Sequence, residues 1–131
     1  MNVEATFARA EALQAAGKHG KAAAIYKHLI KMSEDPRFYI AYGVCLQGLG
    51  HWRDSANNLK RGIDLKPNYC EGDARLFLAE SLLKLGQKKK AIEQWKLVAG
   101  MEPQYPSYEA VPNEAKKMLS EHDTGQVTLR T

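Results

Sequence analysis

LGHWRDSANNLKRGIDLKP (Leu49–Pro67) and LGQKKKAIEQWKLVAGMEP (Leu85–Pro103) are two stretches of equal length that begin with Leu-Gly and end on proline. A third glycine, Gly17, precedes a similar polar turn in AGKHGK. Gly17, Gly50 and Gly86 are 33 and 36 residues apart. A period of about 34 residues with two helical segments in each period predicts an array of helical repeats.

Aligning the three glycines brings small side chains into two columns and large side chains into two others. The small columns hold Ala10, Gly43 and Ala79, and Ala22, Ser55 and Ala91. The large columns hold Leu13, Leu46 and Leu82, and Tyr26, Leu59 and Trp95. Two antiparallel helices approach closely only where both lack bulk, so the small columns predict the contact inside each hairpin. The large residues recur with helical spacing and are expected to fill the space between neighbouring hairpins.

This pattern resembles the tetratricopeptide repeat (TPR) family, in which small residues pack the hairpin, glycine precedes the internal turn and proline closes the repeat. The second repeat carries the pattern best, at Tyr39, Gly43, Leu46, Gly50, Trp52, Ser55, Leu59, Gly62 and Pro67. The third repeat keeps Ala79, Leu82, Gly86, Ala91, Trp95 and Pro103, whereas the first departs most. The resemblance implies an all-α fold, a right-handed superhelical array of antiparallel helix hairpins with about seven helices.

We expect a single TPR domain over residues 1–123, with repeats at about 3–35, 36–69 and 72–105. Asp35 is expected to cap the helix that begins at Pro36. The last hairpin needs a cover, because a hairpin of this kind buries its apolar face only by stacking. A capping helix at about 112–123 supplies that cover through Ala115, Met118, Leu119 and His122, and residues 124–131 are expected to form a C-terminal tail.

The composition is that of a soluble globular protein, with 44% hydrophobic and 26% charged residues. The net charge of +4 suits an acidic partner but falls short of a dedicated nucleic-acid binder. Cys45 and Cys70 form no C-x-x-C motif, which predicts two free thiols in a reducing compartment. The polar N-terminal sequence does not resemble a secretory signal, and no apolar run reaches the length of a membrane helix. We therefore expect a cytoplasmic protein without membrane insertion.

The sequence carries no motif that indicates catalysis. The histidines have no metal-ligand spacing and stand at His19, His28, His51 and His122. There is no G-x-S-x-G motif and no glycine-rich phosphate loop. We expect a protein that is not an enzyme, with no metal and no cofactor.

In TPR proteins the first helix of each hairpin lines a concave groove that usually binds peptides. The resemblance implies a partner-binding groove formed by Phe7, Glu11, Arg37, Ile40, Val44, Gln47, Asp73, Leu76, Phe77 and Glu80. Its apolar members suit an extended or helical segment of a partner. The alternative is that some of these residues pack internally or against the tail. The basic and amide residues with which some TPR proteins grip a C-terminal carboxylate are missing, since Phe7, Glu11, Ala41, Asp73 and Phe77 stand in their places.

The internal turns of a solenoid lie along one edge, and this edge is expected to be basic. It carries Lys18, Lys21, Arg53, Lys88, Lys89 and Lys90. The run Lys88–Lys90 stands in or near the first turn of a helix, where the helix dipole disfavours cations. Either the basic edge has an electrostatic use or it is a solvated turn, and the salt dependence of binding separates these two interpretations.

The leading hypothesis is a non-enzymatic protein–protein interaction module. It would be a TPR adaptor or assembly factor that binds a protein or peptide partner in the groove, as a monomer or weak homodimer. A narrower version is a chaperone for a secreted or self-assembling subunit, since small three-repeat TPR proteins do that work in bacterial secretion systems. A different class is weak nucleic-acid binding along the basic edge, which the scarcity of aromatic residues in the basic turns disfavours.

Overall fold

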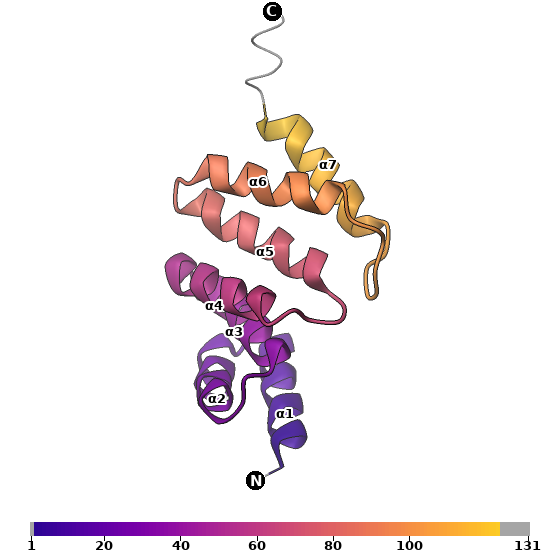
Figure 1. Ribbon diagram of the computed structural model, residues 1–131. Coiled ribbons are helices and arrows are strands. Elements are labelled where there is room, and N and C mark those ends of the chain that lie inside the picture. Colours follow the sequence, from indigo (N-terminus) through magenta and orange to yellow (C-terminus); the bar gives the residue numbers. More distant parts are fainter. Residues whose placement is uncertain (1, 124–131) are drawn as a thin grey trace, which may run out of the picture. The chain divides into compact units, whose positions relative to one another are not determined.

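The computed structural model describes residues 2–123, so the expected tail at 124–131 lies outside the described residues. Within residues 2–123 there are seven α-helices and no strand (Figure 1). The helices are α1 (Val3–Ala15), α2 (His19–Met32), α3 (Pro36–Gly48), α4 (Trp52–Asp64), α5 (Glu71–Lys84), α6 (Lys88–Ala99) and α7 (Ala110–His122). The expected all-α fold of helix hairpins is thereby confirmed.

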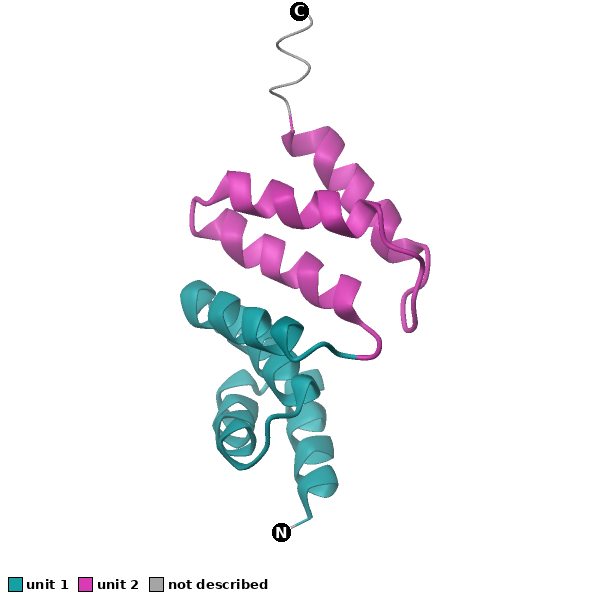
Figure 2. Cartoon of the chain, viewed as in Figure 1, with its two compact units in different colours: residues 1–67 teal, residues 68–131 magenta. Residues whose placement is uncertain are grey.

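The chain forms two compact units (Figure 2). Unit 1 comprises residues 1–67 with helices α1–α4, and unit 2 comprises residues 68–131 with helices α5–α7. Unit 1 therefore holds the first two predicted repeats, and unit 2 holds the third repeat and the capping helix. The right-handed course of the array and the single domain over residues 1–123 stay predictions.

Three turns of the same construction join the two helices of each hairpin. Gly17, Gly50 and Gly86 have φ angles of +79°, +75° and +78°, a left-handed conformation that glycine adopts without a steric penalty. At the second turn the N–H of Gly50 donates to the Gln47 carbonyl and the N–H of His51 to the Leu46 carbonyl, both at 2.9 Å. The other two turns repeat this pair of bonds, which satisfies carbonyls at the helix end. The recurring glycine is therefore a conformational requirement of the turn.

The two columns of small residues lie at the helix–helix contacts, as predicted. All six are buried: Ala10, Ala22, Gly43, Ser55, Ala79 and Ala91. In the second hairpin the Ser55 hydroxyl donates to the Gly43 carbonyl at 2.7 Å. A Cβ atom at Gly43 would lie only 2.6 Å from Cγ of Leu59. Glycine at this position lets the Leu59 side chain of α4 reach the backbone of α3.

Two helices begin in different ways. The Asp35 carboxylate accepts a hydrogen bond from the Arg37 N–H at 2.9 Å and Pro36 is the first residue of α3, which confirms the predicted cap. Helix α5 follows Cys70, a left-handed residue with φ of +62° and no side-chain cap. The Cys70 N–H donates to the Tyr105 carbonyl at 3.2 Å. The start of α5 is thus held by the segment that precedes α7.

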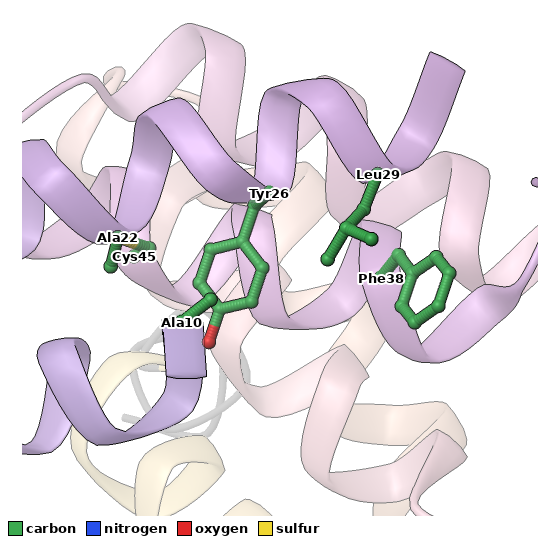
Figure 3. Close-up of a cluster of buried hydrophobic side chains, with 6 residues drawn as sticks. All are labelled: Ala10, Ala22, Tyr26, Leu29, Phe38 and Cys45. Atoms are coloured by element: carbon green, nitrogen blue, oxygen red, sulfur yellow. The ribbon is translucent and has the colours of Figure 1, made fainter. Parts of the chain in front are cut away.

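The core of unit 1 is a cluster from α1, α2 and α3 (Figure 3). Its buried members are Ala10, Ala22, Tyr26, Leu29, Phe38 and Cys45. The Tyr26 hydroxyl donates to Oε1 of Gln14 at 2.7 Å, so its polar atom has a partner. Burial raises the pKa of Tyr26 above its ordinary value. The phenol therefore stays neutral and acts as a core side chain.

The core of unit 2 is built around Trp95 of α6, whose side chain is 1% exposed. Its ring stacks on the His122 ring of α7 with centroids 5.2 Å apart and planes at 28°. Ala115 is fully buried, and Met118, Leu119 and His122 are half-buried. The face that was predicted to cover the last hairpin does cover α6.

Helix α7 begins at Ala110, two residues before the predicted start. Pro112, with which the predicted helix began, stands in the first turn, where its missing N–H needs no partner. Val111 is buried as well, and its Cγ1 would be 2.7 Å from a Cβ at Gly72 of α5. The apolar contact of Val111 with α5 therefore extends the helix towards its N-terminus.

We expect Gly43→Ala to destabilise the fold by about 1–3 kcal/mol, because the new methyl group overlaps Leu59 in a packed contact. Urea unfolding followed by circular dichroism measures the change. The control is Gly20→Ala in α2, where a Cβ meets nothing within 4 Å and the free energy of unfolding should be unchanged or rise by up to ~1 kcal/mol. Equal stabilities for the two variants would contradict the proposed contact.

Candidate partner-binding site

Unit 2 contains a pocket of about 480 Å³ formed by α5, α6 and α7. Its lining residues are Asp73, Leu76, Phe77, Glu80, Leu83, Lys84, Trp95, Glu114 and Met118. This volume falls in the range of about 300–1,000 Å³ typical of ligand pockets. The four groove residues that were predicted from the third repeat are all among them. They are Asp73, Leu76, Phe77 and Glu80.

Helix α5 places most of the lining on one face. The spacing of Asp73, Leu76, Phe77 and Glu80 is three, one and three residues, which gathers them on one side of a helix. The other side of α5 is occupied by its buried residues, which include Leu78, Ala79 and Leu82. The pocket face is therefore the face that α5 does not use for its own hairpin.

Polar contacts hold the α5 face in place. Arg75 makes an ion pair with Glu71 at 2.9 Å and donates to Oε1 of Gln94 on α6 at 2.8 Å. The Ser107 hydroxyl donates to Oδ1 of Asp73 at 2.7 Å. The carboxylates of Glu71 and Asp73 also lie in the first helical turn, where the dipole favours negative charge. Asp73 is thus oriented by its loop neighbour before any ligand arrives.

Five lining residues were missed as site residues by the sequence reasoning: Leu83, Lys84, Trp95, Glu114 and Met118. The groove was derived from the first helix of each hairpin alone, and α7 was treated as a cover. The sequence placed Trp95 among the large residues of the repeats and Met118 on the covering face of the last helix. Both positions indicated burial, and only the fold shows that the two residues border a pocket.

The groove residues of unit 1 have different surroundings. The Phe7 ring lies 5.1 Å from the Phe38 ring and 6.1 Å from the Tyr26 ring, centroid to centroid. Phe7 therefore packs on the core cluster, which is the alternative that the sequence left open. Ile40 packs at the contact of α3 and α4, since a Cβ at Gly62 would lie 2.6 Å from its Cγ1.

The remaining groove residues of unit 1 are Glu11, which is exposed, and Val44 and Gln47, which are half-buried. The predicted groove draws on both compact units, and its continuity from one to the other stays a prediction. The structure brings the four groove residues of the third repeat together in one pocket.

Arg37 acts as a clamp inside unit 1. Its guanidinium pairs with Asp35 at 2.6 Å and with Glu4 of α1 at 2.7 Å. It also lies over the rings of Phe7 and Phe38, at 5.3 and 5.5 Å from their centroids. Hydrogen bonds from Arg37 lower the pKa of Asp35 and the pKa of Glu4 below their ordinary values. These contacts give Arg37 a role in joining α1 to α3.

The predicted basic edge is exposed throughout. Lys18, Lys21 and Arg53 belong to unit 1, and Lys88, Lys89 and Lys90 form the first turn of α6 in unit 2. Within residues 2–123 none of the six takes part in an ion pair, and the first turn of α6 contains no acidic residue. The function of the basic edge stays a prediction.

The described residues offer little to metal or thiol chemistry. Within residues 2–123 no three histidine, cysteine or acidic residues come together as a metal site. Cys45 and Cys70 are free thiols, and burial raises the pKa of each above its ordinary value. A raised pKa leaves less of the nucleophilic thiolate at neutral pH. In the same part of the chain no helix is long and apolar enough to cross a membrane.

Comparison with known proteins finds no matching family model and no matching curated protein. Solved structures do match. The type III secretion translocator chaperone SycD of Yersinia enterocolitica has a TM-score of 0.79 at 21% identity, over 91% of this chain and 88% of SycD. A structure of PcrH from Pseudomonas aeruginosa matches, and PcrH was also solved in complex with the chaperone binding region of PopB. It matches with a TM-score of 0.77 at 25% identity, over 89% of this chain and 94% of PcrH.

A further match is MamA, with a TM-score of 0.73 at 17% identity, over 99% of this chain and 82% of MamA. At these identities the likeness shows the fold. It is a TPR-like helical fold, as the sequence resemblance implied.

We expect Arg37→Gln to lower the free energy of unfolding at pH 7, because the ion pair with Glu4 that joins α1 to α3 and the ion pair with Asp35 are both lost. Both carboxyl pKa values are lowered in the folded chain, so this contribution is present above the ordinary carboxyl pKa of about 4 and disappears as the pH falls below it. Urea unfolding at a series of pH values should show the difference from the parent shrinking on acidification.

Arg9→Gln is the matched control, since Arg9 is an exposed residue of α1. It should leave the free energy of unfolding within about 0.5 kcal/mol of the parent value. If Arg37→Gln changes the stability as little as Arg9→Gln does, the role of Arg37 in joining α1 to α3 is wrong.

Proposed function

We propose that this chain is a non-enzymatic protein-binding module that acts as a small TPR-type chaperone. It would hold a segment of a secreted or self-assembling subunit until that subunit is delivered. The observation that carries the proposal is the apolar pocket beside α5, which contains every groove residue predicted from the third repeat. An open pocket with an apolar floor is the usual form of a site that binds an extended or helical peptide.

The comparisons favour the chaperone over a general adaptor. SycD was solved with a peptide of the translocator YopD, and PcrH was solved with the chaperone binding regions of PopB and of PopD. These ligands belong to those proteins. They support the proposal because the fold they bind is the fold of this chain.

The proposal also covers the number of repeats, the domain organisation, the cellular location and the oligomeric state. We take the chain to contain three TPR repeats and a capping helix within one domain, and to work in the cytoplasm. The chain covers 88% of SycD and 94% of PcrH, which supports one domain of this size. One structure of SycD is described as an alternative dimer, so a weak homodimer fits the proposal as well as a monomer does.

Nucleic-acid binding is the weaker candidate. The pocket is lined by three carboxylates, Asp73, Glu80 and Glu114, and by one ammonium group, Lys84. Phosphates would be repelled from such a surface. A nucleic acid would have to use the basic edge, where the aromatic residues that stack on bases are scarce.

The proposal predicts that Phe77→Glu abolishes partner capture, because a carboxylate would enter the apolar floor of the pocket. The tagged chain is used to capture proteins from the host lysate, and each captured protein is then expressed alone and together with the chain. A chaperone client should be insoluble alone and soluble with the parent chain, and Phe77→Glu should lose both capture and solubilisation.

Leu97→Glu is the matched control, since Leu97 is a 54% exposed apolar residue of α6 outside the pocket lining. It should capture and solubilise the client as the parent does. Circular dichroism of both variants checks that the helices are retained. A client that is soluble without the chain, or one that Phe77→Glu still solubilises, would overturn the proposal.

A further inference from the structure

We propose that the pocket of unit 2 recognises a segment whose apolar side chains are flanked by lysine or arginine. This inference rests on the proposed function and adds to it the charge of the partner segment. It concerns only α5, α6 and α7, which lie within one compact unit.

The charge at the pocket is opposite to the charge of the chain. Asp73, Glu80 and Glu114 against Lys84 give the lining a net charge of −2, whereas the whole chain carries +4. A basic segment is therefore not attracted by the protein at long range, and its attraction is confined to this site. Complementary charge of this kind selects among partners and sets their register more than it adds affinity.

The apolar part of the pocket lies between these charges. Leu76 and Phe77 stand between Asp73 and Glu80 along α5, and Met118 adds apolar surface from α7. Trp95 of α6, which is almost fully buried, closes the pocket from below. Phe77 is 36% exposed, so part of this apolar surface faces water. Methionine adapts its shape to different side chains, which suits a site that accepts more than one apolar residue.

The spacing along α5 indicates the spacing in the partner. Asp73 and Glu80 are seven residues apart, which is about 10 Å along a helix axis. An extended chain covers that distance in about three residues. A short apolar stretch with a basic residue on each side would therefore bring one long, flexible lysine or arginine side chain within reach of each carboxylate. Because neighbouring side chains of an extended chain point to opposite sides, one apolar side chain of the stretch would lie over Leu76 and Phe77.

The Asp73 carboxylate is prepared for this role. The Ser107 hydroxyl bonds its Oδ1 at 2.7 Å and fixes the orientation of the group. A carboxylate accepts several hydrogen bonds, so this contact leaves acceptor capacity for a lysine or arginine. Glu114 is half-buried on α7, across the pocket from α5. Partial burial reduces the screening of its charge by salt.

The experiment measures the binding of three labelled peptides to the full chain by fluorescence anisotropy. The first peptide is Gly-Ser-Lys-Leu-Leu-Lys-Ser-Gly, the second has glutamate for both lysines, and the third has serine for both leucines. We expect the lysine peptide to bind roughly threefold to tenfold more tightly than the glutamate peptide, from two ion pairs at a partly exposed site. The serine peptide should not bind, and the preference should shrink as salt is raised.

Paired variants test the carboxylates without changing the apolar lining. Glu80→Gln combined with Glu114→Gln should remove most of the preference for lysine over glutamate. The control combines Glu93→Gln with Glu121→Gln, two exposed residues of α6 and α7 outside the pocket lining. The control changes the net charge by the same amount and should keep the preference.

The outcomes separate this inference from the function on which it rests. If the lysine and glutamate peptides bind equally well and the serine peptide does not bind, the pocket is a docking site and the charge inference is overturned. If none of the peptides binds, or the serine peptide binds as well as the others, the docking site itself is wrong.

A further arm tests whether this chain supplies the occupant. Leu129 and Arg130, an apolar and a basic residue, are neighbours in the sequence outside the described residues. If Leu129→Ser combined with Arg130→Ser raises the affinity of the lysine peptide, the occupant is the chain itself, and the assignment of the pocket to a partner is overturned. Unchanged affinity supports the partner.

Discussion

The close contact of paired helices at residues without bulk is the constraint on which the rest of this structure depends. At Gly43 even a methyl group would overlap Leu59, and the carbonyl of Gly43 is bonded by Ser55 across the same contact. A left-handed glycine must follow the first helix so that the second can return at this distance. Because of these two requirements, one face of each helix packs inside the hairpin, and the other faces can contact neighbouring helices or a ligand.

The pocket of unit 2 lies on the face of α5 that does not pack into the hairpin with α6. The buried side of α5 packs into the hairpin, and α7 covers Trp95 at one end through the His122 ring. Leu76 and Phe77 are then apolar residues on a face that the described helices do not fill. The proposed chaperone function places a segment of another protein on this face.

Residues at equivalent positions of the repeats make different contacts, which limits what a repeat alignment can predict about a site. Arg37 and Asp73 occupy the same position of the second and third repeats. Arg37 has acidic neighbours in Asp35 and in Glu4 of α1, so it joins two helices of unit 1. Asp73 meets only the hydroxyl of Ser107 among the side-chain contacts described, and it lines the pocket. Phe7, likewise, was predicted for a groove and packs on the core cluster.

The sequence by itself determined the helices, their turns and the residues at the hairpin contacts. These depend on local requirements, namely positive φ at glycine, small volume at a contact and helical spacing of apolar residues, and each is visible in the order of residues. The cap at Asp35 and the burial of Trp95 belong to the same class.

Only the tertiary structure decided which surface residues line the pocket. Glu114 lines the pocket because α7 lies across from α5, and Arg37 is paired with an acidic residue because Glu4 reaches it from α1. Such contacts join residues far apart in the chain, and no local pattern records them.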